Sequence, residues 1–223
     1  VDSQAYAEAL NEVKIIGMKN HAQRTTDQTM MASFWMGMAG TIGEAGRMNL
    51  VAQQAASAHG NTLCENARLF ALVNLALADA AIAGIECKYT YSFWRPITAI
   101  REAANDGNPL TVADTIWEPY ITTPAHPEYV STHSVLTRAA AVVLAEFFGT
   151  DEAELVLEPF MHDPDMHDHV MTRHYTSFSQ VADEAGLSRL YGGIHFRFSY
   201  DAGSQLGQDI GEYVYDNLLL PVQ

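Results

Sequence analysis

The chain has 223 residues, of which 48% are hydrophobic and 17% are charged, so it has the length and apolar content to bury a sizeable core. Its 12 basic and 27 acidic residues give a formal net charge of −15, which argues against nucleic acid and anionic membranes as partners because both would repel it. Two cysteines, Cys64 and Cys87, are too few for a disulfide framework, and their apolar neighbours predict buried free thiols.

The amino-terminal stretch VDSQAYAEALNEVKIIG already follows a helical apolar period through Tyr6, Leu10, Val13 and Ile16. It has no initial Met and no signal-peptide pattern. We therefore expect a fragment or a processed chain.

Amphipathic patterns predict helices over 4–17, 27–38, 42–59, 61–86, 88–103, 132–148, 176–187 and 194–219. The stretches between them are rich in Pro, Gly, Asn and Asp, and no long alternating β pattern is present. No repeat, low-complexity tract or linker divides the chain. The expected fold class is therefore all-α, a helical bundle that forms one domain over residues 1–223.

The most apolar segment, LFALVNLALADAAIAGI, is short for a bilayer span and contains Asn74 and Asp79. It predicts a buried core helix, and we expect no membrane insertion.

The next segment, KYTYSFWRP, places Lys88 and Arg95 seven residues apart, so both cations would project from one face of a continuous helix. Pro96 can instead break the helix, and Arg95 would then lie near a helix start where its side chain can be aimed. On its own, this motif is explained as simply by two solvated surface cations.

The stretch HPEYVSTHSV leads into a strongly apolar pattern that predicts a buried helix beginning near Thr132 or His133. Free N–H groups at a helix start, together with the Ser131 hydroxyl, would form an anion site, with His133 as a titratable group beside it. The alternative is that Ser131 or Thr132 simply caps the helix.

A His-rich stretch, MHDPDMHDHVMTRH, offers side chains that suit zinc or another divalent ion. They are His162, His167, His169 and His174 with Asp163, Asp165 and Asp168. We favour an acidic loop over the mouth of a pocket, so no divalent metal is expected.

In SRLYGGIHFRFSYDAG, Arg189 and His195 are six residues apart and would point away from each other on one unbroken helix. Gly192 and Gly193 predict a break, so that Arg189 reaches back from a loop while His195 starts a new helix. A structural His–Arg pair explains this motif alone equally well.

Taken together, the three motifs are more specific. Lys88-x6-Arg95-Pro96, then 33 residues, Val130-Ser131-Thr132-His133, then 54 residues, and Ser188-Arg189-x5-His195 resembles the signature shared by vanadium-dependent haloperoxidases and the type 2 phosphatidic acid phosphatase superfamily. QRTTDQTMMASFW and TIGEAGRMNLVAQQ also resemble segments of bacterial haloperoxidases. The resemblance covers essentially the whole chain, as the carboxy-terminal catalytic half of such an enzyme.

The resemblance implies a pocket for a tetrahedral oxyanion, vanadate or phosphate. The residues that would hold it are Lys88, Arg95, Arg189, Ser131 and the amide of Thr132. His195 would bind vanadium, or attack phosphorus, while His133 would act as acid/base on the opposite side, assisted by Lys88.

Two further positions acquire roles by the same resemblance. Asp27 would pair with the site arginines, and His126 falls where the family has a halide-pocket residue, which is histidine in bromoperoxidases and phenylalanine in chloroperoxidases. Bromide or iodide is therefore expected in preference to chloride.

The chain departs from the family pattern at two positions. Thr132 replaces a glycine and adds a β-branched side chain beside the oxyanion. Ser199 stands where the family has an aspartate that orients the imidazole, with Asp201 two residues further on, and Ser199 could accept the same hydrogen bond from His195 more weakly.

Three functions remain open at this point. A haloperoxidase would use hydrogen peroxide and halide at a bound vanadate, whereas an acid phosphatase would hydrolyse phosphate esters through a phosphohistidine without a divalent metal. The third is a non-catalytic relic that only binds oxyanions. The resemblance also implies an absent amino-terminal half, so an apolar face would seek that half or a second copy of the chain.

Overall fold

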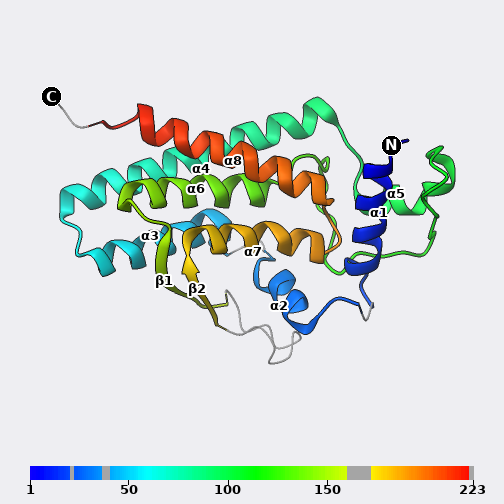
Figure 1. Ribbon diagram of the computed structural model, residues 1–223, viewed down its shortest axis with the longest axis horizontal. Helices are drawn as coiled ribbons and strands as arrows, with labels where there is room; N and C mark the ends of the chain where they lie inside the picture. The colour runs from blue at the N-terminus through cyan, green and yellow to red at the C-terminus, as the bar shows by residue number, and fades with distance from the viewer. Residues whose placement is uncertain (21–22, 37–40, 160–171, 221–223) are drawn as a thin grey trace.

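The computed structural model describes residues 1–20, 23–36, 41–159 and 172–220 and confirms the all-α fold class (Figure 1). Its helices are α1 (Gln4–Ile16), α2 (Thr26–Phe34), α3 (Gly43–His59), α4 (Leu63–Tyr91), α5 (Pro96–Arg101), the 3-10 helix η1 (Ala103–Asn105), α6 (Thr132–Phe148), α7 (Phe178–Tyr191) and α8 (Arg197–Asn217). Two strands, β1 (Glu152–Leu157) and β2 (Arg173–Ser177), complete the described elements.

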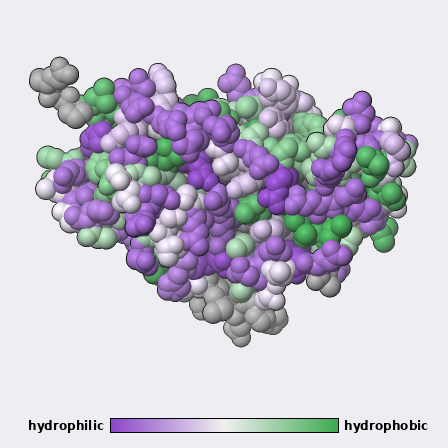
Figure 2. Space-filling model, in the orientation of Figure 1, coloured by the Kyte–Doolittle hydropathy of each residue, from purple (hydrophilic) through white to green (hydrophobic). Residues whose placement is uncertain are grey.

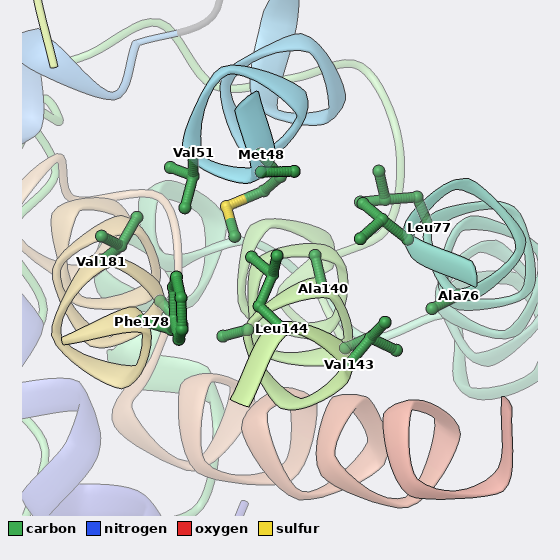
Figure 3. Close-up of a cluster of buried hydrophobic side chains, with 14 of the residues drawn as sticks. Met48, Val51, Ala76, Leu77, Ala140, Val143, Leu144, Phe178 and Val181 are labelled. Atoms are coloured by element: carbon green, nitrogen blue, oxygen red, sulfur yellow. The ribbon is translucent and has the colours of Figure 1, made fainter. Parts of the chain in front are cut away.

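Helix α6 is the centre of the bundle, with α8, α4, α7 and α3 packed around it. Figure 3 shows its side chains meeting those of three neighbours in one buried cluster. The labelled residues are Ala140, Val143 and Leu144 of α6, Met48 and Val51 of α3, Ala76 and Leu77 of α4, and Phe178 and Val181 of α7. This core fixes the helix ends on which the candidate site lies.

Helix α4 is long and apolar enough to cross a membrane by length and composition alone. In this fold it packs against α6, α8 and α3, and its inward positions are fully buried. Its other side exposes apolar residues such as Leu75, Ile82 and Ile85. The segment 69–85 is therefore a core helix, as predicted, with one apolar side left uncovered.

Local sequence explains several helix boundaries. Thr62 and Glu65 form a capping box at the start of α4, and Thr25 and Gln28 form another before α2. Helix α6 ends where Gly149 adopts a left-handed conformation with φ of 71°.

Three glycines let α8 approach α6 closely. An added Cβ would lie 2.8 Å from the Ser131 carbonyl oxygen at Gly203, 2.5 Å from the Val135 carbonyl oxygen at Gly207, and 2.7 Å from a Val142 side-chain carbon at Gly211. A side chain at any of the three would push the helices apart. The contact holds the start of α8 beside the start of α6.

The predicted helix over 88–103 is wrong. Helix α4 continues to Tyr91, and α5 begins at Pro96, with Arg95 in the capping position. Pro96 has no N–H to donate, so it suits the first turn of a new helix better than the middle of a long one. The alternative interpretation, with Pro96 as a breaker, is the correct one.

The strand pair was not predicted. β1 and β2 are antiparallel, and Leu155, Leu157 and Tyr175 point into the core beside α3 and α7. Each strand is only five or six residues long, so the alternation is too brief to stand out from helical patterns. His174 lies exposed on β2, whereas the other residues of the His-rich stretch before it lie outside the described residues.

The surface in Figure 2 is mainly hydrophilic, and its hydrophobic residues gather toward the end of the molecule that carries α1 and α5. Both cysteines are free, but Cys64 is exposed, so the prediction of a buried thiol is wrong there. Cys64 lies in the first turn of α4, on the side away from the core.

Candidate active site

The candidate site lies where the amino-terminal end of α6 meets the ends of four other segments. Lys88 comes from the last turn of α4, Arg95 from the start of α5, and Arg189 from the last turn of α7. His195 lies just before α8, and Ser131 occupies the capping position of α6. The fold thus brings the three sequence motifs together.

Lys88 is fully buried, and its Nζ donates to the carbonyl oxygens of Glu128 at 2.9 Å and Val130 at 2.5 Å. Because an ammonium group has three donors, one N–H remains for a ligand. Burial lowers the pKa of Lys88 to about 7, with Arg95 adding to the effect and Glu128 opposing it.

Arg95 lies across the break between α4 and α5 from Lys88, not on the same helix face. Its Nη1 donates to the carbonyl oxygen of Ile194 at 2.7 Å and lies 3.1 Å from Nε2 of His195. Its Nε donates to the carbonyl oxygen of His126 at 3.0 Å. Burial lowers the pKa of Arg95 to about 10, so the guanidinium stays charged at neutral pH.

Arg189 lies inside α7, so the predicted loop placement is wrong, and His195 precedes α8 rather than starting it. The break is still where it was predicted, since Gly193 has a φ of 77° and an added Cβ there would lie 2.3 Å from a backbone oxygen. Arg189 Nη1 donates to the carbonyl oxygen of Trp35 at 3.0 Å. Its Nε is buried and has no hydrogen-bond partner among the described residues.

Ser131 caps α6 by position, but its hydroxyl makes no capping hydrogen bond. Instead its Oγ accepts from Ser134 at 2.9 Å, which leaves its own hydrogen available to an anion beside the first-turn amide of Thr132. The Thr132 side chain packs on α4, where its Cγ2 would lie 3.5 Å from a Cβ added to Gly84.

His195 is oriented by a residue that the sequence analysis missed. Its Nδ1 lies 2.8 Å from Oε1 of Glu128, a fully buried carboxylate two residues before Val130. Ser199 donates to Oε2 of Glu128 at 2.8 Å and does not contact the imidazole. The expected hydrogen bond from His195 to Ser199 is therefore wrong.

Asp201 does not orient His195 either. It is exposed on α8 and lines a cleft of about 850 Å³ with Glu12, Arg197 and Phe198. Asp201 lies four residues after Arg197, so the two side chains lie on the same side of α8, away from the imidazole.

His133 has a carboxylate partner as well. Its Nε2 lies 2.6 Å from Oε1 of Glu44 in α3 and 3.3 Å from the Trp35 carbonyl oxygen. Burial alone would raise the pKa of Glu44, but the charge and hydrogen bond of His133 outweigh it and lower the pKa to about 2. Burial and the charge of Arg189 lower the pKa of His133, so a neutral imidazole donates to an ionised Glu44 at neutral pH.

The electrostatics of the site come from cations gathered in a buried place. Burial, and then the charges of Arg95, Lys88 and Arg189, lower the pKa of His195 well below its usual value. The ring is therefore neutral at physiological pH and has a lone pair to offer. Burial raises the pKa of Glu128 to about 7, against the hydrogen bonds from Phe196 and Ser199.

The predicted pairing of Asp27 with the site arginines is wrong. Asp27 Oδ1 accepts from Nη1 of Arg173 at 2.9 Å, and Arg173 also pairs with the buried Glu184. Strand β2 carries Arg173 to the surface end of α2, so the carboxylate is engaged there. His126 does reach the site, with Nδ1 3.1 Å from Nη2 of Arg95.

The donor set fits a tetrahedral oxyanion. Three buried cations, a free lysine N–H, a serine hydroxyl and first-turn amides lie around a buried neutral imidazole whose Nε2 faces Arg95. The unpartnered Nε of Arg189 is the sharpest sign, because a buried guanidinium N–H is costly to leave without an acceptor. Among the described residues, no group of three or more His, Cys, Asp or Glu side chains is placed to hold a metal cation.

Comparison with known proteins identifies the family of the chain. A family model described as the VCPO second helical-bundle domain matches residues 68–223. The chain belongs to this family. The resemblance to vanadium haloperoxidases that the three motifs carry is thereby confirmed.

Similar proteins match most of this chain but only part of their own length. Vanadium chloroperoxidase of Curvularia inaequalis is 28% identical, over 63% of this chain and 29% of the relative. The structure of a bacterial vanadium-dependent iodoperoxidase matches with 30% identity and a TM-score of 0.77, over 98% of this chain and 50% of that one. A holo-type bacterial vanadium-dependent chloroperoxidase shares the fold, with a TM-score of 0.70 and 20% identity over 95% of this chain and 47% of that one. The chain spans about half the length of these solved relatives.

Glu128 could have been singled out from the sequence. It lies inside the HPEYVSTH motif, and a glutamate is unusual so close to the start of a buried helix. Glu44 and the Trp35 carbonyl carried no such signal, since their contacts to His133 join α3 and α2 to α6 across the bundle.

Proposed function

We propose that this chain binds vanadate and uses hydrogen peroxide to oxidise halide, converting halide, peroxide and one proton to hypohalous acid and water. The observation that carries the proposal is a group of three buried cations whose charges act on His195, with Arg95 3.1 Å from its Nε2 and the Nε of Arg189 without an acceptor among the described residues. Membership of the VCPO bundle family supports it.

Different residues of the site would bind the oxyanion and ligate the vanadium. Lys88, Arg95 and Arg189 would hold the oxyanion charge, and the hydroxyl of Ser131 and the amide of Thr132 would bind its oxygens. His195 Nε2 would be the vanadium ligand, because its Nδ1 faces Glu128. Bound vanadate would supply the Lewis-acidic centre at which peroxide becomes reactive toward halide.

His133 would move the proton. Its ring uses Nε2 for the described hydrogen bonds to Glu44 and Trp35, which leaves Nδ1 to exchange a proton with a substrate. The side chain is 17% exposed, whereas the His195 side chain is 5% exposed, so His133 is the histidine that can reach solvent protons.

Iodide or bromide is the proposed halide. His126 is fixed beside Arg95, and this is the position at which histidine accompanies bromide oxidation in the resemblance. The relative whose structure matches 98% of this chain is described as an iodoperoxidase.

The test is halide oxidation by the purified chain with hydrogen peroxide, before and after orthovanadate is added, with iodide, bromide and chloride in parallel. We expect turnover that requires vanadate, is lost in His195→Ala, and is fastest with iodide or bromide. A preference for chloride would overturn the halide assignment alone.

Two other outcomes replace the proposal. Hydrolysis of p-nitrophenyl phosphate without divalent metal, blocked by vanadate and with phosphate trapped on His195, would identify an acid phosphatase, since the same donors suit phosphate. Binding of vanadate with neither activity would identify an oxyanion-binding relic.

A further inference from the structure

Glu128 is a fully enclosed carboxyl group at the centre of the site. Its side chain has no exposed surface, and its Oε1 accepts from the backbone N–H of Phe196 at 3.0 Å as well as facing Nδ1 of His195 at 2.8 Å. Oε2 accepts from Ser199 at 2.8 Å. A buried carboxylate with three donors around it is held in one orientation.

The two nitrogens of His195 have contacts that determine where its proton resides. Arg95 can only donate, so its Nη1, 3.1 Å from Nε2 of His195, favours a lone pair on Nε2. The proton is then on Nδ1 and is donated to Glu128. Two independent contacts thus select the tautomer whose Nε2 can bind an oxyanion centre.

Glu128 also connects the separate segments of the site through its backbone. Its carbonyl oxygen accepts from Nζ of Lys88, and its N–H donates to the Phe93 carbonyl oxygen at 2.9 Å. One residue therefore joins the end of α4, the turn before α6 and the start of α8. Contacts to Glu128 therefore fix the positions of both His195 and Lys88.

We propose that Glu128 is the positioning residue for His195 in this chain, and that Ser199 holds Glu128 in place of the aspartate that the family pattern has at that position. In this chain the carboxylate that orients the imidazole therefore comes from the turn before α6, whereas the family pattern places it on α8. The proposal rests on the proposed function only for the role of His195 toward an oxyanion.

The first test reads the tautomer in the free protein. Long-range ¹H–¹⁵N spectra distinguish Nδ1–H from Nε2–H, and the His195 signals are assigned by their loss in His195→Gln. We expect Nδ1–H in the wild type and in Glu128→Gln, whose amide oxygen can still accept, and a mixture in Glu128→Ala. An Nε2–H tautomer in the wild type, or an unchanged tautomer in Glu128→Ala, overturns the proposal.

The second test measures affinity for inorganic phosphate and orthovanadate by calorimetry. Residues that support a metal-binding histidine typically contribute about 10–100-fold in affinity, and we expect a loss in that range for Glu128→Ala and a smaller one for Glu128→Gln. Glu12→Gln is the matched control, because Glu12 is a carboxylate that pairs with Arg197 at the start of α8 without touching His195.

The sharpest test restores the family residue. In Ser199→Asp, a second carboxylate would meet Oε2 of Glu128 in a buried place, so we expect weaker anion binding rather than stronger. Removing Glu128 as well, in Ser199→Asp with Glu128→Ala, should recover affinity. Tighter binding by Ser199→Asp alone would overturn the proposal.

These readouts separate the two claims. If the wild type binds neither phosphate nor vanadate, the proposed function fails, while the tautomer comparison in the free protein still decides the role of Glu128. If Glu128→Ala does not fold, judged by its thermal unfolding, the tautomer of Glu128→Gln and the Ser199→Asp comparison decide it.

Discussion

The site contains two histidine–glutamate pairs that differ in construction. His195 and Glu128 are almost completely buried, and their hydrogen bond uses Nδ1. His133 and Glu44 lie at the edge of the site, 17% and 20% exposed, and their hydrogen bond uses Nε2. The same two residue types therefore leave opposite ring nitrogens available.

The difference indicates a division of labour. A buried imidazole with a fixed tautomer suits holding a ligand, because it cannot readily gain a proton. A partly exposed imidazole beside an ionised carboxylate suits proton transfer, because solvent can replace the proton that it gives up. The four predictions below test this contrast.

The largest expected effect separates the two histidines. His195→Ala should weaken orthovanadate binding by more than about 100-fold, beyond the range typical of residues that only support a ligand. His133→Ala should keep most of the affinity but lower vanadate-dependent turnover by about 10²–10⁴-fold, the usual contribution of a general acid or base. Calorimetry and peroxide-dependent iodide oxidation measure the two. Equal losses of affinity would end the division of labour.

The second expected effect is a pH dependence of anion binding through Lys88. Its pKa is about 7 in the free site, so raising the pH above 7 removes the ammonium charge that an anion needs. Affinity should then fall by about tenfold per pH unit, and binding should raise the pKa of Lys88 by linkage. Tungstate titrations by calorimetry from pH 6 to 9 measure this with a probe of constant charge.

The control for this dependence is Lys88→Met. Arg95 and Arg189 keep their charge over this range, since burial lowers the pKa of each only to about 10. The variant should bind weakly at every pH with a shallower profile, in which the ionisation of Glu128, whose pKa burial raises to about 7, is the remaining contribution. An unchanged slope in Lys88→Met would assign the titration to a group other than Lys88.

A smaller effect is expected for Glu44→Gln. The variant keeps a hydrogen-bond acceptor for His133 but loses the charge that favours the imidazolium, so the acid limb of the turnover profile should move to lower pH. The rate should fall roughly tenfold, equivalent to about 1.4 kcal/mol and to one charge-assisted hydrogen bond. Vanadate affinity serves as the internal control, because it should change far less than in Glu128→Ala.

The smallest effect is expected for Thr132→Gly. The threonine side chain lies against Gly84 on α4, so removing it should change vanadate affinity less than about threefold, while the loss of helix propensity costs under about 1 kcal/mol. Binding and thermal unfolding measure both. A large gain in affinity would show that the threonine crowds the oxyanion after all.

The sequence by itself determined the fold class and the order of the motifs. Apolar periods around Leu72, Val143 and Val181 are local patterns, and each predicts a helix whatever packs against it. Pro96 and Gly193 likewise act through their own backbone, so the breaks before α5 and α8 could be anticipated from single residues.

Only the tertiary structure decided which side chains became partners. Asp27 could have faced Arg95 or Arg189, but β2 brings Arg173 to it, and Ser199 turned out to hold Glu128 rather than His195. The physical reason is that a hydrogen bond depends on placing two segments within about 3 Å, and the packing of distant helices sets that distance. Local patterns contain no such information, which is why the motifs could be placed along the chain while the contacts of Asp27 and Ser199 could not be predicted.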